Sequence, residues 1–132
     1  MDVNGKIMSF REAMKRAERL ALELDDARNA TPKSPKLDGL PKSGSQTTLD
    51  LQMEVIERAA IRFEQAREEA LEELNELEEM IDQLPEYRQK QVLYFRHIYR
   101  MKWAEVADRM HYSDSTVRRI NAKTLKEMED TE

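Results

Sequence analysis

Apolar residues recur every three or four positions over most of the chain, which is the spacing of one face of an α-helix. The longest such stripe runs from Leu49 to Leu84 and predicts one long helix with a heptad pattern, in a helical hairpin or a coiled coil. Its one polar member is Arg67, whose stem we expect to pack while its charge reaches water. The members between the two ends are Met53, Ile56, Ala60, Phe63, Arg67, Ala70, Leu74, Leu77 and Ile81.

A shorter stripe lies before it. Ser9 and Glu12 have the spacing of a capping box and open an amphipathic pattern that extends to residue 28, so we expect an N-terminal helix within residues 1–28. Its basic residues lie off the stripe, where they can pair with the Glu-rich run 68–79 of the long helix. Residues 29–48 hold three of the 4 Pro and two of the 3 Gly without any periodicity. This composition predicts a linker.

After the long acidic helix of residues 49–84, Pro85 begins a further domain of residues 85–132, in which three short helices fit at about 86–100, 103–110 and 114–128. The second and third of these have the layout of a helix-turn-helix. Ser113 is placed to cap the last helix, and His111 takes the turn position that needs a positive φ, which His tolerates better than most residues. We expect the small residue Ala107 at the helix crossing, Tyr112 in the turn, and an inward face of Val106, Met110, Val117, Ile120 and Thr124 or Leu125.

With Val117 and Ile120 turned inward, the opposite face of the last helix points to solvent and would enter the major groove of DNA. Arginine can donate two hydrogen bonds to guanine, aspartate can accept from cytosine, and lysines suit phosphates. The alternative interpretation is that Arg118 and Arg119 are simply exposed on the surface of a three-helix protein-binding module. The expected DNA-contacting residues are Lys102, Asp114, Ser115, Thr116, Arg118, Arg119, Lys123 and Lys126.

Composition changes this picture little. Hydrophobic residues make up 39%, charged residues 37% and Gly only 3 positions of the 132, a balance typical of an all-α protein. The net charge of −5 argues against nucleic-acid binding, but it is unevenly placed, since residues 49–84 carry −9 and residues 86–126 carry +6. No Cys is present, and no apolar run approaches the length of a membrane span or a signal peptide. We therefore expect a cytoplasmic protein without cofactor or metal that is not an enzyme.

The aromatic residues bear on what kind of DNA is bound. Trp103, Tyr87, Tyr94 and Tyr99 could form a stacking surface for single strands, but their helical spacing fits packing better, with Trp103 anchoring the start of its helix. The first 84 residues contain Phe10 and Phe63 as their aromatic side chains, both on apolar stripes. No surface for capturing melted DNA is therefore expected outside the helix-turn-helix.

The stretch "LPEYRQKQVLYFRHIYRMKWAEVADRMHYSDSTVRRINAKTL" resembles the fourth conserved region of sigma-70-type sigma factors. The whole chain, with its "SPKLDGLPKSGS" segment before the long helix, is similar to phage late-gene transcriptional activators of the ArpU and RinA type. The resemblance places the base-contacting sites on Asp114, Ser115, Arg118 and Arg119. Sigma factors usually have Arg and Glu at the first two of these positions, which implies a DNA target other than a standard −35 element.

These observations predict a sequence-specific regulator of transcription that binds double-stranded DNA and acts with host RNA polymerase or its sigma factor. A homodimer is expected because residues 49–84 would span about 54 Å as a helix, whereas residues 10–28 would span about 28 Å and leave apolar surface uncovered. Two other classes remain open. One is a small DNA-packaging subunit of the terminase type, and the other is an adaptor that binds polymerase without binding DNA.

Overall fold

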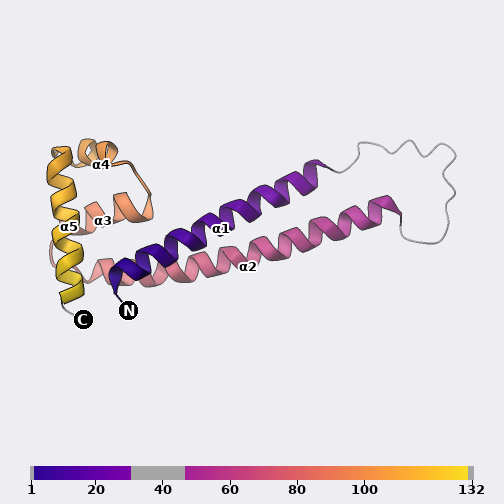
Figure 1. Cartoon of the computed structure of the whole chain (residues 1–132), viewed down its shortest axis with the longest axis horizontal. Coiled ribbons are helices and arrows are strands. Elements are labelled where there is room, and N and C mark those ends of the chain that lie inside the picture. The colour runs from indigo at the N-terminus through magenta and orange to yellow at the C-terminus, as the bar shows by residue number, and fades with distance from the viewer. Residues whose placement is uncertain (1, 31–46, 131–132) are drawn as a thin grey trace. The chain divides into compact units, whose positions relative to one another are not determined.

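The structure, a computed structural model, describes residues 2–30 and 47–130, which are mostly helical (Figure 1). This part of the chain contains no strand, so the all-α prediction is confirmed. None of its helices is long and apolar enough to cross a membrane. The predicted linker lies almost wholly outside the described residues. The helices are α1 (Val3–Asn29), α2 (Thr48–Asp82), α3 (Tyr87–Leu93), the π-helical turn η1 (Tyr94–Ile98), α4 (Trp103–Met110) and α5 (Asp114–Asp130).

Helix α1 begins earlier than its capping pattern predicts. Ser9 lies inside the helix, and the Asp2 carboxylate instead accepts a hydrogen bond from the Gly5 N–H in the first turn. Val3 and Ile7 are buried and extend the apolar stripe upstream. The expected start at Ser9 is therefore wrong. The helix has 27 residues and a length of about 40 Å rather than 28 Å, which weakens the length argument for a dimer.

The chain divides into two compact units, Met1–Glu12 with Ala70–Glu132 and Ala13–Glu69. In the second unit, parts of α1 and α2 pack together through small side chains, and the Arg16 guanidinium lies 2.8 Å from the Glu69 carboxylate. This ion pair joins the basic face of α1 to the acidic run of α2, as the charge pattern predicts. The buried residues of this unit include Ala13, Ala17, Leu24, Ala59 and Ala66.

The buried face of α2 differs from the predicted stripe by one residue along part of its length. Ala59 and Ala66 are buried, whereas Ala60 is half-buried and Arg67 is exposed. Both stripes satisfy the same heptad spacing, and the one through the two alanines keeps a charged residue out of the contact between the helices. The buried seam therefore passes through Ala66 and not through Arg67 as predicted.

The first unit contains the larger core. Beside this core Lys6 is buried between Glu73 and Glu76, and its hydrogen bond to Glu76 raises the lysine pKa above its usual value. Asn4 donates a hydrogen bond to Glu129 and so joins the beginning of α1 to the end of α5. The residues that are buried completely, or nearly so, in this unit are Val3, Leu77, Ile81, Val92, Leu93, Val106, Val117 and Thr124.

The helix predicted at 86–100 is interrupted. Helix α3 ends at Leu93 and passes into η1, where the Tyr99 N–H donates to the Tyr94 carbonyl at 2.9 Å, five residues back. Arg100 then takes a positive φ of 58°, which ends the helix before α4. Such π-helical turns occur often at functional sites.

Candidate nucleic-acid interface

The turn between α4 and α5 has the geometry that the sequence predicts. His111 closes α4 in the left-handed conformation, with φ 60° and ψ 39°. The Ser113 hydroxyl accepts a hydrogen bond from the Thr116 N–H at 3.2 Å and so caps α5. Tyr112 is 40% exposed and does not fill the turn as predicted; instead, its N–H donates to the Ala107 carbonyl, which ties the turn backbone to α4.

The inward faces of α4 and α5 form one apolar cluster. Val106, Ala107 and Val117 are buried there together with Val92 of α3. Thr124 is buried one turn further along α5, whereas Leu125 is half-buried, so Thr124 is the more fully buried of the two predicted candidates. Ile120 and Met110 pack partly against the cluster. This packing fixes which face of α5 points outward.

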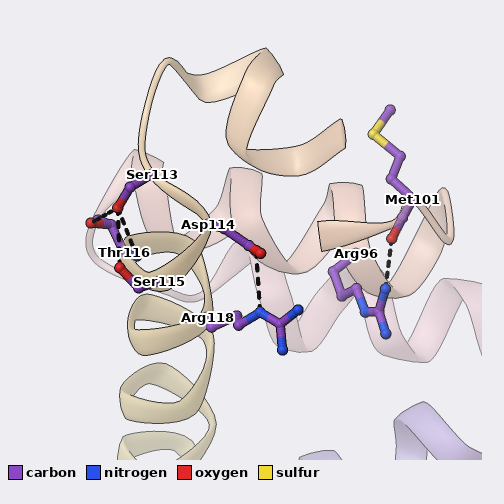
Figure 2. A network of polar contacts seen from close by, with 7 residues as sticks. All are labelled: Arg96, Met101, Ser113, Asp114, Ser115, Thr116 and Arg118. Carbon is purple, nitrogen blue, oxygen red and sulfur yellow. Dashed lines mark hydrogen bonds and ion pairs between the residues drawn. The ribbon is translucent and has the colours of Figure 1, made fainter. Parts of the chain in front are cut away.

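The outward face of α5 carries the predicted DNA-contacting residues. Thr116 is half-buried, and its hydroxyl lies 2.7 Å from that of Ser113, while the Ser115 hydroxyl lies 3.3 Å from the same oxygen (Figure 2). These two side chains therefore take part in the cap network at the start of α5. The exposed members are Lys102 at the start of α4 and Asp114, Ser115, Arg118, Arg119, Lys123 and Lys126 on α5.

Asp114 contacts Arg118 one helical turn away. Its carboxylate oxygen lies 3.1 Å from Nε of the arginine, and both side chains are more than half exposed (Figure 2). The carboxylate also lies in the first turn of α5, where the helix dipole favours negative charge. With Nε engaged by Asp114, the guanidinium has its two terminal nitrogens left for an outside acceptor. The sequence pattern suggested a cytosine contact for Asp114 and did not reveal this pair.

Two guanidinium groups lie over the ring of Trp103, the first residue of α4. The Arg96 guanidinium carbon is 4.6 Å from the ring centroid, and that of Arg118 is 5.6 Å away. Arg96 also donates a hydrogen bond to the Met101 carbonyl at 2.9 Å (Figure 2). Sequence reasoning gave Arg96 no role and gave Trp103 only a packing role. No sequence spacing could have revealed the cluster, because it joins residues from η1, α4 and α5.

His97 joins η1 to α5. Its Nε2 lies 2.8 Å from the Asn121 side-chain oxygen, so this nitrogen carries the proton and donates. The other ring nitrogen is buried without a hydrogen-bond partner among the described residues. Burial lowers the pKa of His97, and the positive charges of Arg11 and Arg96 act in the same direction, opposed by the Asn121 hydrogen bond.

The tyrosines of this unit differ from one another. Tyr94 packs against α2, where burial and the carboxylates of Glu78 and Asp82 raise its pKa to about 12. Tyr87 is 73% exposed, so the expectation that it packs is wrong, whereas Tyr99 is 61% exposed but its ring lies beside those of Tyr94 and Phe95, with centroids 6.3 Å and 6.2 Å away. Tyr87 is the first residue of α3, and Tyr99 directly follows the π-helical turn.

Together, the turn, the cap, the packed inner face and the basic outer face define a helix-turn-helix of the kind that places its second helix against nucleic acid. Comparison with known families agrees, since residues 70–128 match the family described as Sigma-70, region 4. This segment is therefore similar to sigma-70 region 4, which is a DNA-binding helix-turn-helix domain. No curated protein and no solved structure was found to match the chain. Within the described residues no group of His, Cys, Asp or Glu is arranged to hold a metal ion.

Proposed function

We propose that the protein is a sequence-specific DNA-binding regulator of transcription, with α5 as the helix that enters the major groove. The observation that carries this proposal is the sigma-70 region 4-like helix-turn-helix with an exposed basic face. Arg118 and Arg119 are the proposed base-contacting residues, and Ser115 adds a short polar contact. Lys102, Lys123 and Lys126 contact phosphates, which set affinity but not sequence preference. Asp114 acts chiefly through Arg118.

Substitution of single residues on α5 tests this division of roles. A cognate duplex is first selected from a random library with the wild-type protein, and binding is then titrated on cognate and scrambled duplexes at fixed salt. Arg118→Ala and Arg119→Ala should each cost about 1 to 3 kcal/mol on the cognate duplex and much less on the scrambled one. Lys126→Ala is the matched control, because loss of a phosphate contact weakens both duplexes alike. Equal losses on both duplexes for the arginine variants would reject base recognition.

The proposed biological role is activation of phage late genes in the bacterial cytoplasm, together with host polymerase that already carries a sigma factor. Opening a promoter requires aromatic platforms for unstacked bases. Of the two aromatic residues in the first 84, Phe10 is buried and Phe63 is half-buried. The exposed Tyr87 and Tyr99 lie within residues 70–128, the segment that matches sigma-70 region 4.

Run-off transcription separates an activator from a sigma factor. The protein should stimulate polymerase holoenzyme at a promoter that contains the selected site, and it should not start transcription with core polymerase alone. Specific initiation with the core enzyme, accompanied by permanganate-reactive thymines, would show that the protein is a minimal sigma factor. Failure to bind any duplex, together with retention of polymerase binding, would favour an adaptor.

We also propose that the protein acts as a homodimer. The first part of α2 exposes a group of large apolar side chains, as expected of a surface that a second copy covers. Light scattering at tens of micromolar should give twice the chain mass, and Ile61→Glu should give the monomer. Gln65→Glu, which adds the same charge at an exposed position one turn away, is the control. A wild-type monomer at that concentration would remove the dimer. The exposed apolar residues are Leu49, Leu51, Met53, Val55 and Ile61.

A further inference from the structure

Trp103 holds a position that packing alone does not explain. One part of its side chain lies against the buried cluster of Val92, Val106 and Val117, and the rest remains partly exposed at the start of α4. Its ring has guanidinium groups from two other elements within 6 Å of the ring centroid, at 4.6 Å for Arg96 and 5.6 Å for Arg118. Tryptophan is the aromatic side chain that attracts a cation most strongly.

Arg118 is restrained at two points. Asp114 engages Nε of the guanidinium at 3.1 Å, and the Trp103 ring lies 5.6 Å from the guanidinium carbon. An exposed arginine with neither contact has several rotatable bonds, and ordering it on binding costs on the order of 0.5 to 1.5 kcal/mol. The two contacts reduce that cost before DNA arrives and leave the terminal nitrogens available. Asp114 precedes Arg118 on the same helix, whereas Trp103 holds it from a different one.

Arg96 fixes the ring itself. Its guanidinium donates to the Met101 carbonyl at 2.9 Å and lies over the Trp103 ring, so it ties the segment before α4 to η1. The orientation of the indole is therefore set by residues outside the recognition helix, and the position of Arg118 depends on it.

We propose that Trp103 is a positioning residue that holds Arg118 in the orientation for base recognition and so contributes to sequence specificity without touching DNA. This inference rests on the proposed function, because it assigns a support to one of the proposed base-contacting residues. Arg119 provides the internal comparison, since it is also exposed but lies about 100° further around α5.

The first test uses the free protein and needs no DNA. The Nε–Hε resonance of Arg118 should show an aromatic ring-current shift in the wild type and in Trp103→Phe. In Trp103→Leu it should lose this shift and become more mobile, although Asp114 still engages Nε. Leucine keeps an apolar side chain against the cluster but removes the ring, and thermal unfolding checks that the variant folds. An unchanged Arg118 resonance in folded Trp103→Leu would overturn the proposal.

The second test is a double-mutant cycle on DNA. Trp103→Leu should reduce the ratio of cognate to scrambled affinity about two- to fivefold, the size expected for an exposed cation–π contact. This reduction should persist in the Arg119→Ala background and disappear in the Arg118→Ala background. Trp103→Phe, which keeps an aromatic ring, should retain the wild-type ratio of cognate to scrambled affinity. An equal reduction in the Arg118→Ala background would show a merely structural role and overturn the proposal.

The two proposals fail in different ways. If Arg118→Ala relaxes specificity while Trp103→Leu does not, the positioning role is wrong and the proposed function stands. If Arg118→Ala leaves specificity unchanged, Arg118 does not recognise bases. In that case both the base contact proposed for Arg118 and the positioning role of Trp103 are wrong.

Discussion

The helix-turn-helix and the first part of α2 are both helical and both rich in apolar side chains, yet they use them differently. Val117 of α5 is 0% exposed, whereas Val55 of α2 is 56% exposed. In the helix-turn-helix, Ser113 and His111 set where α5 begins, and Val117 packs against Val92 of α3 and Val106 of α4. The first part of α2 also begins at a cap, because the Asp50 N–H donates to the Thr47 hydroxyl at 3.1 Å and the Thr47 N–H donates to the Asp50 carboxylate at 3.2 Å. Apolar spacing and caps thus predict that a helix forms and where it begins, whereas the helices that pack against it determine which of its sides is buried.

The largest expected effect comes from a charge placed at these two valines. Val117→Asp buries an unpaired carboxylate and should cost about 3 to 5 kcal/mol, enough to unfold the domain. Val55→Asp makes the same chemical change at an exposed position and should alter the free energy of unfolding by less than about 0.5 kcal/mol. Chemical denaturation of the full chain, in a buffer where the protein is monomeric, measures both. Similar losses for the two variants would show that Val55 is not exposed in the folded monomer.

A smaller effect tests which face of α2 is buried. Ala66→Arg introduces a long side chain at a position that is 4% exposed and should cost about 1 to 3 kcal/mol by overpacking. Arg67→Ala removes an exposed side chain and should change stability by less than about 0.5 kcal/mol. Thermal unfolding of the two variants decides between the stripe through Ala66 and the stripe through Arg67. A larger loss for Arg67→Ala would restore the stripe that the sequence predicts.

The start of a helix gives a third comparison, between Ser113 before α5 and Ser9 within α1. Ser113 caps α5, so Ser113→Ala should cost about 1 kcal/mol. Ser9 has a similar sequence context but lies within α1, where alanine is a better helix former, so Ser9→Ala should be neutral or slightly stabilising. Thermal melts at one concentration suffice. Equal destabilisation would indicate that the N-terminal helix begins at Ser9 after all.

These contrasts show which features the sequence could predict. Helix positions, the buried Val106 and Val117, the turn at His111 and the cap at Ser113 all follow from local spacing and local chemistry. The Asp114–Arg118 pair also has a local spacing, of four residues, but nothing in the pattern chose it over a contact with DNA. The π-helical turn at 94–98 could not be predicted, because its hydrogen bonds depend on how the chain packs.

The cluster around Trp103 is even less predictable from the sequence. It requires Arg96, Trp103 and Arg118 to approach from three elements, and the distances between them are set by the packing of α4 and α5 on η1. The same holds for His97, whose partner Asn121 lies 24 residues away. Tertiary contacts of this kind need the structure.

The smallest effect concerns the pH dependence of the helix-turn-helix, which the first part of α2 should not share. Burial lowers the pKa of His97 below its ordinary value of 6.5, so the unfolded chain binds a proton at this histidine more readily than the folded chain. Above about pH 7, His97 therefore does not lower the stability of the domain. As the pH falls through 6.5 toward the lowered pKa that His97 has in the folded chain, the domain loses stability. A proton on the unpaired ring nitrogen would lie buried near Arg11 and Arg96, whose positive charges oppose it.

His97→Gln tests this expectation, because glutamine keeps a donor toward Asn121 without a titrating ring. The variant should flatten the dependence of the free energy of unfolding on pH between pH 7.5 and pH 5. Chemical denaturation at several pH values compares the variant with wild type, with His111→Gln as the control for the exposed histidine. If the wild type and His97→Gln lose stability in parallel over this range, His97 is not the group responsible.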